Sequence, residues 1–253
     1  MPDQNRPEPP ATESPSQARA TVLSATERTR HRRLREQGRS ERADLIAVLR
    51  SGFVAHLGVL VDGVPMVVPT TYGYDEDTLY LHGSVASRSL TPDDTATACV
   101  TITLVDGLVL ARSVFEHAVN YRSAMIYGIP RLVTEPDEKL RGLRLLSEHL
   151  APGQWDYARQ PSRKELAKTT LLALTLDEAS VKVRSGPPDD ADSPDAALGL
   201  WAGELPLIST WGEPVPDPAL PASTDVPPHL AARARTRAFS PAPSDPAPSD
   251  PAP

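Results

Sequence analysis

The run TLYLHGSVASR at residues 78–88 joins a strand pattern to a cluster of hydrogen-bond donors. Leu79 and Leu81 alternate with Tyr80 and His82 at the period of a half-buried strand. After Gly83 the chain supplies hydroxyl and guanidinium groups at Ser84, Ser87, Arg88 and Ser89. Hydroxyls, backbone N–H groups and a guanidinium are the donors that bind a phosphate monoester. The run therefore predicts a phosphate site at the end of a strand, with an ordinary polar loop as the alternative.

Strand signals occur on both sides of this run. The pair Asp62-Gly63 is typical of a two-residue hairpin between the strands at 53–61 and 64–74. Further strand patterns cover residues 78–82, 96–104, 108–112, 123–133, 171–176 and 179–184. Crossover helices are missing between the first four strands, which argues against a parallel α/β sheet. Consecutive antiparallel strands avoid open edges by closing on themselves, so a mainly β protein with a barrel and few helices is expected.

Helix patterns are few. Residues 24–50 are good helix formers, which Gly38 and Ser40 divide into an arginine-rich first half and a second half with a short apolar stripe. The first half favours a solvated helix over a nucleic-acid contact, because aromatic residues are absent and glutamates dilute the charge. Leucines recur around a predicted helix at 138–150, and residues 164–170 give a weaker helix signal.

The prolines define the domain organisation. Of 28 prolines, five lie in residues 1–20 and sixteen lie from Pro187 onward, so residues 21–186 are free to form one continuous domain. Residues 1–20 and the Pro/Ala/Ser/Asp repeats at 239–253 bury too little apolar surface to order themselves, and both are expected to be disordered tails. Residues 187–238 are expected to be a proline-rich extension that packs partly on the barrel.

Charge and composition exclude several classes of function. The net charge of −7 argues against a generic nucleic-acid binder. Cys99 is the single cysteine, so an intramolecular disulfide is excluded and no metal site is expected. A signal peptide and a membrane-spanning apolar run are not recognised, and a cytoplasmic protein without a membrane partner is expected.

Four motifs, in this order and spacing, resemble the flavin-binding split barrels related to pyridoxamine 5′-phosphate oxidase, in the branch that includes the nitroimidazole-resistance proteins. The motifs are VVPTTY at 67–72, LYLHGS with ASR at 79–88, DGLVLARS at 106–113, and NYRS with a glycine at 120–128. The resemblance extends over about residues 28–204. It implies a six-stranded antiparallel split barrel that forms a homodimer, with one FMN in each of two clefts between the subunits.

The resemblance also implies roles for single residues. Ser87 and Arg88 become the phosphate ligands, and the backbone of Gly83 and Ser84 lies near the ribityl chain. The family often has a second basic residue where this chain has Ser89, so an arginine from elsewhere, such as Arg122, is a candidate for the missing charge.

A flavin ring needs a flat apolar slot and a few hydrogen bonds to its heteroatoms. The backbone around Pro69, Thr70 and Thr71 is expected to provide both, together with Tyr72. An edge strand with a core aromatic residue is the alternative for Pro69 and Tyr72. His82 is the candidate catalytic residue, pointing toward the flavin or a substrate carbonyl, and a structural histidine is the alternative.

Four further residues complete the predicted FMN site. Asn120 and Arg122 lie where the family has a polar contact to FMN. Lys182 and Trp201 resemble a C-terminal element that reaches the FMN edge from the partner subunit, although Trp201 is equally interpreted as a packing anchor. His117 lies in a predicted loop and is expected to be solvated.

These residues support three hypotheses for function. The first is an FMN-dependent oxidoreductase that acts on a small-molecule substrate, because the flavin supplies the electron chemistry and no acid–base pair is needed. The second replaces FMN by a deazaflavin coenzyme. The third is a barrel that holds FMN or haem without turnover, with His82 or His117 as the iron ligand. Genuine pyridoxamine 5′-phosphate oxidase activity is disfavoured, because the substrate-phosphate residues are not recognised.

Overall fold

The first strands of the protein form a tight hairpin. The computed structural model describes residues 21–90 and 96–238, and the tails expected at 1–20 and 239–253 lie outside this part. Strand β2 (Val54–Val61) pairs with β3 (Val64–Tyr74), and the two turn residues Asp62 and Gly63 have φ values of 52° and 76°. Left-handed backbone at both turn positions is what a two-residue hairpin requires. The predicted hairpin is confirmed.

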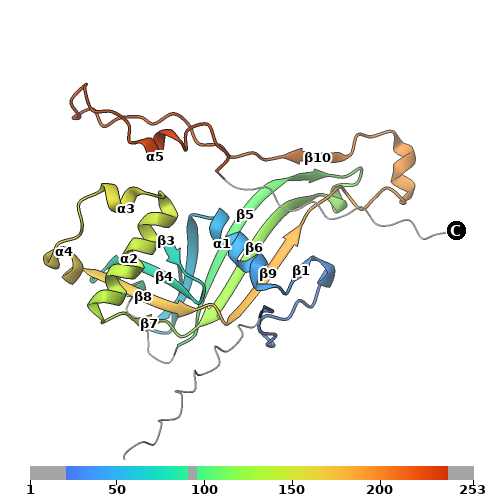
Figure 1. Ribbon diagram of the computed structural model, residues 1–253. Coiled ribbons are helices and arrows are strands. Elements are labelled where there is room, and N and C mark those ends of the chain that lie inside the picture. The colour runs from blue at the N-terminus through green and yellow to red at the C-terminus, as the bar shows by residue number, and fades with distance from the viewer. Residues whose placement is uncertain (1–20, 91–95, 239–253) are drawn as a thin grey trace, which may run out of the picture.

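All strands belong to one curled antiparallel sheet (Figure 1). The order is β1-β9-β6-β5-β2-β3-β4-β8-β7, and β10 pairs with β5. The remaining strands are β1 (Gly38–Arg39), β4 (Thr78–Ser84), β5 (Ala98–Leu110), β6 (Ala118–Gly128), β7 (Arg131–Leu132), β8 (Thr169–Thr175), β9 (Glu178–Arg184) and β10 (Gly203–Pro206).

The mainly β split-barrel fold is confirmed, but the sheet has ten strands where six were expected. Three of the extra strands, β1, β7 and β10, have only two to four residues, which is too short for a recognisable alternation of side chains. The two segments predicted at 96–104 and 108–112 form a single strand, β5, with a register shift between Val105 and Gly107.

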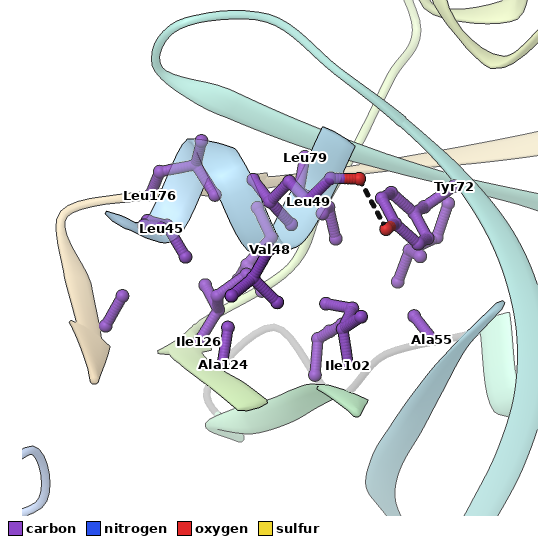
Figure 2. Packing of buried hydrophobic residues seen from close by; sticks show 14 of the residues in the cluster. Leu45, Val48, Leu49, Ala55, Tyr72, Leu79, Ile102, Ala124, Ile126 and Leu176 are labelled. Atoms are coloured by element: carbon purple, nitrogen blue, oxygen red, sulfur yellow. Dashed lines mark hydrogen bonds between the residues drawn. The ribbon is translucent and has the colours of Figure 1, made fainter. Parts of the chain in front are cut away.

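The barrel interior is filled by aliphatic side chains from β2, β4, β5, β6, β8 and β9, and helix α1 (Arg42–Ser51) covers one end of it. Figure 2 shows the packing of Leu45, Val48 and Leu49 of α1 against this cluster. The Tyr72 hydroxyl donates a hydrogen bond to the Leu49 carbonyl at 2.7 Å, so this tyrosine joins the helix to the sheet. Tyr72 is fully buried, as the core-aromatic alternative predicted.

A second, smaller core lies on the outer face of β4 and β8. Helix α2 (Pro136–Leu150) covers it, and its buried members are Tyr80, Val133, Leu146, Leu171 and Ala173. A Cβ built on Gly73 would lie 2.4 Å from the Leu146 nitrogen, so glycine permits the close approach of α2 to β3. Figure 1 shows α2, α3 (Gln154–Tyr157) and α4 (Arg163–Ala167) grouped beside β4 and β8.

The prediction of a helix in the arginine-rich half of residues 24–50 is wrong. This segment is irregular apart from the 3₁₀ helix η1 (Arg35–Gln37) and β1. The Arg28 guanidinium donates to both carboxylate oxygens of Glu178 at 3.0 and 2.7 Å, and the Thr26 hydroxyl donates to the same carboxylate at 2.6 Å. Contacts to a distant strand therefore hold this segment in place, and they override its helix propensity.

The C-terminal extension follows β9 as a long segment that contains η4 (Pro194–Leu198), β10 and α5 (Pro228–Ala231). It runs from β10 back toward α3 (Figure 1). The Arg233 guanidinium lies 4.3 Å from the Trp211 ring centroid and donates to the Leu150 carbonyl at 2.6 Å. The other short helices are η2 (Arg88–Leu90) and η3 (Val114–Glu116). Among the described residues, none of the helices has the length and apolar character needed to span a membrane.

Candidate functional site

Strand β4 points its alternate side chains in two directions. Leu79 and Leu81 belong to the barrel core, whereas Tyr80 belongs to the second core beneath α2. His82 is two residues beyond Tyr80 and therefore lies on the same outer face of the sheet. It is opposite Leu171 of β8, which is also in the second core. The histidine is thus directed away from the barrel interior and toward the helices.

A pocket of about 390 Å³ lies on this outer face, and His82 is one of its walls. Helix α2 contributes Leu143, Leu146 and Leu150, and the following segment contributes Trp155 and Pro161. The remaining lining residues are polar: Ser147, Arg159, Glu165 and Thr169. An apolar pocket of this volume with a few polar groups has the composition of a small-molecule or cofactor site.

One ring nitrogen of His82 has no hydrogen-bond partner among the described residues. Its Nδ1 is buried and makes no hydrogen bond within the part of the chain that the structure describes. Burial also lowers the pKa of this imidazole, which favours the neutral ring at neutral pH. A neutral imidazole beside a pocket is the form that ligates metals, and an unpartnered buried nitrogen calls for an explanation.

Arg159 and Glu165 form an ion pair on the pocket wall. The Arg159 Nη2 lies 2.8 Å from Glu165 Oε1, and the Nη1 donates to Glu165 Oε2 at 3.1 Å. Both side chains are largely exposed, so the pair marks the open side of the pocket. The pocket thus has a half-buried imidazole, an apolar middle and a charged mouth.

The side chains predicted to bind phosphate after β4 make contacts within the protein itself. The Ser87 hydroxyl lies 3.0 Å from that of Ser89, and the Ser84 hydroxyl accepts a hydrogen bond from the Ala86 amide at 3.2 Å. The Arg88 side chain is 67% exposed and forms an ion pair with Asp62 in the β2–β3 turn. This turn also contacts the α4–β8 connection, because the Val85 amide donates to the Lys168 carbonyl at 3.3 Å.

The sheet is split beside this turn. Strand β3 pairs with β4 only over Tyr72–Tyr74, while its earlier residues pair with β2 alone among the described strands. The second backbone edge of β3 at Pro69, Thr70 and Thr71 is therefore available for hydrogen bonds to a ligand. Pro69 is exposed and the two threonines are half-buried. This arrangement is compatible with the flavin-ring contact expected from the sequence.

Asn120 and Arg122 lie within β6 and are engaged by the protein itself. The Arg122 side chain is 5% exposed and donates to both oxygens of Asp106, at 2.9 and 2.8 Å. The Asn120 amide donates to Glu204 at 2.6 Å, and its oxygen accepts from Arg184. Both residues stabilise the barrel and its junction with β10, and the charge of Arg122 is neutralised by Asp106.

The other predicted residues are distributed over the surface. Lys182 lies on β9 opposite Gly38 and Ser123. Trp201 precedes β10, and two thirds of it is exposed. His117 is exposed near the β5–β6 connection, where its Nδ1 accepts a hydrogen bond from the Ala111 amide at 3.1 Å. Of the two histidines proposed as iron ligands, His82 alone lines the pocket.

The fold agrees with the comparisons to known proteins. The model of the family described as pyridoxamine 5′-phosphate oxidase matches residues 41–183, and the chain belongs to this family. The resemblance drawn from the four sequence motifs is therefore confirmed. Among curated proteins, no sequence match was found.

Two solved structures are similar over most of the chain. The flavocytochrome Anf3 from Azotobacter vinelandii is 34% identical with a TM-score of 0.78, and the match covers 83% of this chain and 98% of that one. An FAD and haem binding protein from Mycobacterium smegmatis is 35% identical with a TM-score of 0.75, and the match covers 81% of this chain and 100% of that one.

Sequence reasoning missed the helical side of the pocket. The pattern at 138–150 predicted a packing helix, and it did not show that part of the leucine surface faces a cavity. Trp155 and Arg159 follow this helix in a segment without a recognisable motif. The one available signal was His82 itself, a titratable side chain that alternates with Leu79 and Leu81 along the strand.

Proposed function

We propose that this protein is a redox protein that binds both a flavin and a haem, with His82 as the residue that would hold the haem iron. A bound flavin supplies hydride and single-electron transfer, and a bound haem supplies one-electron and O₂ chemistry. The observation that carries the haem assignment is the position of His82, which lines an apolar pocket and has one ring nitrogen, Nδ1, without a hydrogen-bond partner within the described residues.

The residues of the pocket fit a haem in their chemistry. Leu143 and Leu150 present aliphatic surface to a flat apolar ring, and Trp155 adds an aromatic surface. The lowered pKa of His82 keeps its imidazole neutral, so iron does not have to displace a proton near neutral pH. The flavocytochrome and the FAD and haem binding protein, each about one-third identical to this chain, support the same assignment.

Family membership and the same two relatives support flavin binding. In this proposal, the free edge of β3 contacts the flavin ring, and the turn of Ser84, Ser87 and Arg88 contacts a phosphate group. The sequence motifs favour FMN, whereas the Mycobacterium smegmatis relative is titled as an FAD binder. Reduction of a small-molecule substrate is the proposed use of the flavin.

A homodimer is part of the proposal, with the flavin between the subunits. Exposed apolar side chains support it, because they gather along neighbouring strands of the sheet. They include Val54 and Leu60 of β2, Val67 of β3, Val105 and Leu108 of β5, and Val119 and Met125 of β6. Apolar surface of this kind marks a site of protein association when it is contiguous.

The haem assignment is tested by titrating the purified protein with ferric haem and recording the Soret band. The wild-type chain is expected to give a saturable shifted band, and His82→Ala is expected to abolish it. His117→Ala is the matched control, because His117 is exposed near a hairpin and is expected to leave the spectrum unchanged. A wild-type chain without a saturable Soret band, or an unaffected His82→Ala variant, would overturn the assignment.

The flavin assignment has a separate test. Flavin released from the purified protein is identified by mass, and FMN, FAD and a deazaflavin are titrated into the stripped protein. Quenching of flavin fluorescence at micromolar protein is expected for FMN or FAD. Preferential binding of the deazaflavin would show that the site takes a deazaflavin and not FMN or FAD. No binding of any of the three would refute the flavin site. Release of flavin on dilution is expected if the cleft is shared between subunits.

A further inference from the structure

Arg159 is the single cationic residue among those that line the His82 pocket in the described part of the chain. Its side chain is 72% exposed, which places the charge at the mouth, whereas His82 lines the wall and is only partly exposed. The two ends of the pocket therefore differ in polarity. A ligand that fits this gradient has an apolar body and an anionic end that stays near water.

Glu165 occupies a fixed position beside this arginine. It is the third residue of α4, and its Oε2 accepts a hydrogen bond from the Ser162 amide at 2.7 Å in a reciprocal capping box. The Arg159 guanidinium, followed by the hydrogen bonds from Ser162, lowers the pKa of this carboxyl to about 2. Glu165 thus carries a negative charge at every physiological pH and is held in place by the helix end.

A fixed carboxylate at the mouth would repel an anionic ligand if Arg159 did not lie beside it. Arg159 has donors left for a second acceptor. A guanidinium has five N–H groups, and three take part in bonds here: two to Glu165 and one to the Gln160 carbonyl at 2.9 Å. The Nε–H and one Nη2–H make no hydrogen bond within the described residues. Arg159 is thus able to donate hydrogen bonds to a ligand carboxylate while Glu165 continues to orient the guanidinium.

We infer that Arg159 binds the carboxylate groups of the haem at the pocket mouth, and that Glu165 positions the guanidinium for this contact. The inference rests on the proposed haem site and adds the residues that recognise the charged edge of the ring. A contact between Arg159 and the haem carboxylates would make the pocket selective for a dicarboxylate porphyrin over an uncharged one. Charge-assisted hydrogen bonds of this type are about twice as strong as neutral ones, so the selectivity is measurable.

The test compares ferric haem with its dimethyl ester, which has the same ring and iron but no free carboxylates. Affinity is followed by the Soret band, and dissociation is followed by transfer to excess apomyoglobin. The wild-type chain is expected to hold haem at least about tenfold more tightly than the ester. In Arg159→Gln this preference is expected to disappear through weaker binding of haem, with the ester unchanged and the Soret maximum, which reports His82, in the same place.

Arg163→Gln is the matched control. It removes the same charge from the neighbouring helix α4, but Arg163 does not line the pocket. It is expected to retain the preference for haem over the ester. Equal preferences in wild type and Arg159→Gln, or an equal loss in Arg163→Gln, would overturn the inference while leaving the haem site intact. A wild-type chain that binds neither compound would instead refute the haem site on which the inference rests.

Discussion

Asp62 and Arg88 form an ion pair between the β2–β3 turn and the short helix η2. Their side chains are 79% and 67% exposed, so solvent screens the attraction and the pair contributes little to stability. The contact nevertheless determines where the Arg88 guanidinium points in the absence of a ligand. Asp62 therefore competes with any phosphate group for the arginine proposed to bind it.

Arg88→Ala is expected to weaken flavin binding by about 2 kcal/mol, or roughly 30-fold, because a charged hydrogen bond to the phosphate is lost. Asp62→Asn should leave flavin binding unchanged or strengthen it, since the competing carboxylate is removed while asparagine tolerates the left-handed turn. Fluorescence titration measures both affinities. Unchanged affinity in Arg88→Ala would move the phosphate site away from this turn.

Asp106→Ala is expected to destabilise the fold by roughly 3 kcal/mol, because it leaves the buried Arg122 guanidinium without its carboxylate. The free energy of unfolding is obtained from urea denaturation. The double variant Asp106→Leu with Arg122→Met removes both charges and should recover much of the loss. If the single and double variants are equally unstable, the cost arises from packing and not from an unpaired charge.

Trp211→Ala is expected to release the end of the C-terminal extension, because Trp211 packs between Phe53 at 5.4 Å and the Arg233 guanidinium at 4.3 Å. The change removes an aromatic contact and a cation–π contact, together about 1–2 kcal/mol. Amide hydrogen exchange in residues 207–238 should then accelerate. Trp201→Ala serves as the control, since Trp201 is two thirds exposed, and comparable acceleration in both variants would contradict the assigned role.

The free energy of unfolding of the cofactor-free protein is expected to fall as the pH drops below about 6.5. Burial lowers the pKa of His149, with a further contribution from Arg233, and its Nε2 donates to the Gly52 carbonyl at 2.8 Å. The unfolded chain therefore takes up the proton at a higher pH than the folded protein does, and acid favours unfolding.

In the variant His149→Gln this pH dependence should be shallower, since one of the titrating groups is gone. Part of it should remain, because burial also lowers the pKa of His82. Urea denaturation at pH 5 and pH 7.5 measures the difference. Equal slopes in wild type and variant would exclude His149 as a contributor.

The regular parts of the fold were predictable because they depend on short-range signals. The hairpin at Asp62-Gly63 follows from the left-handed backbone that these two residues tolerate, and the strand at Thr78–Ser84 follows from its alternating side chains. The arginine-rich segment was predicted wrongly because its structure depends on Glu178, about 150 residues away. Local propensity carries no information about such a partner.

The candidate site, like the fold, was predictable from the sequence only in part. The four motifs together identified the family, and His82 was singled out as a histidine expected to point toward the flavin or a substrate carbonyl. The sequence could not indicate that α2, Trp155 and Arg159 would enclose that histidine, because a leucine-rich helix has the same pattern whether its apolar face is fully packed or partly lines a cavity. Tertiary structure decided which leucines remain uncovered, since packing of α2 against β4 and β8 buries Leu146 and leaves space beside His82.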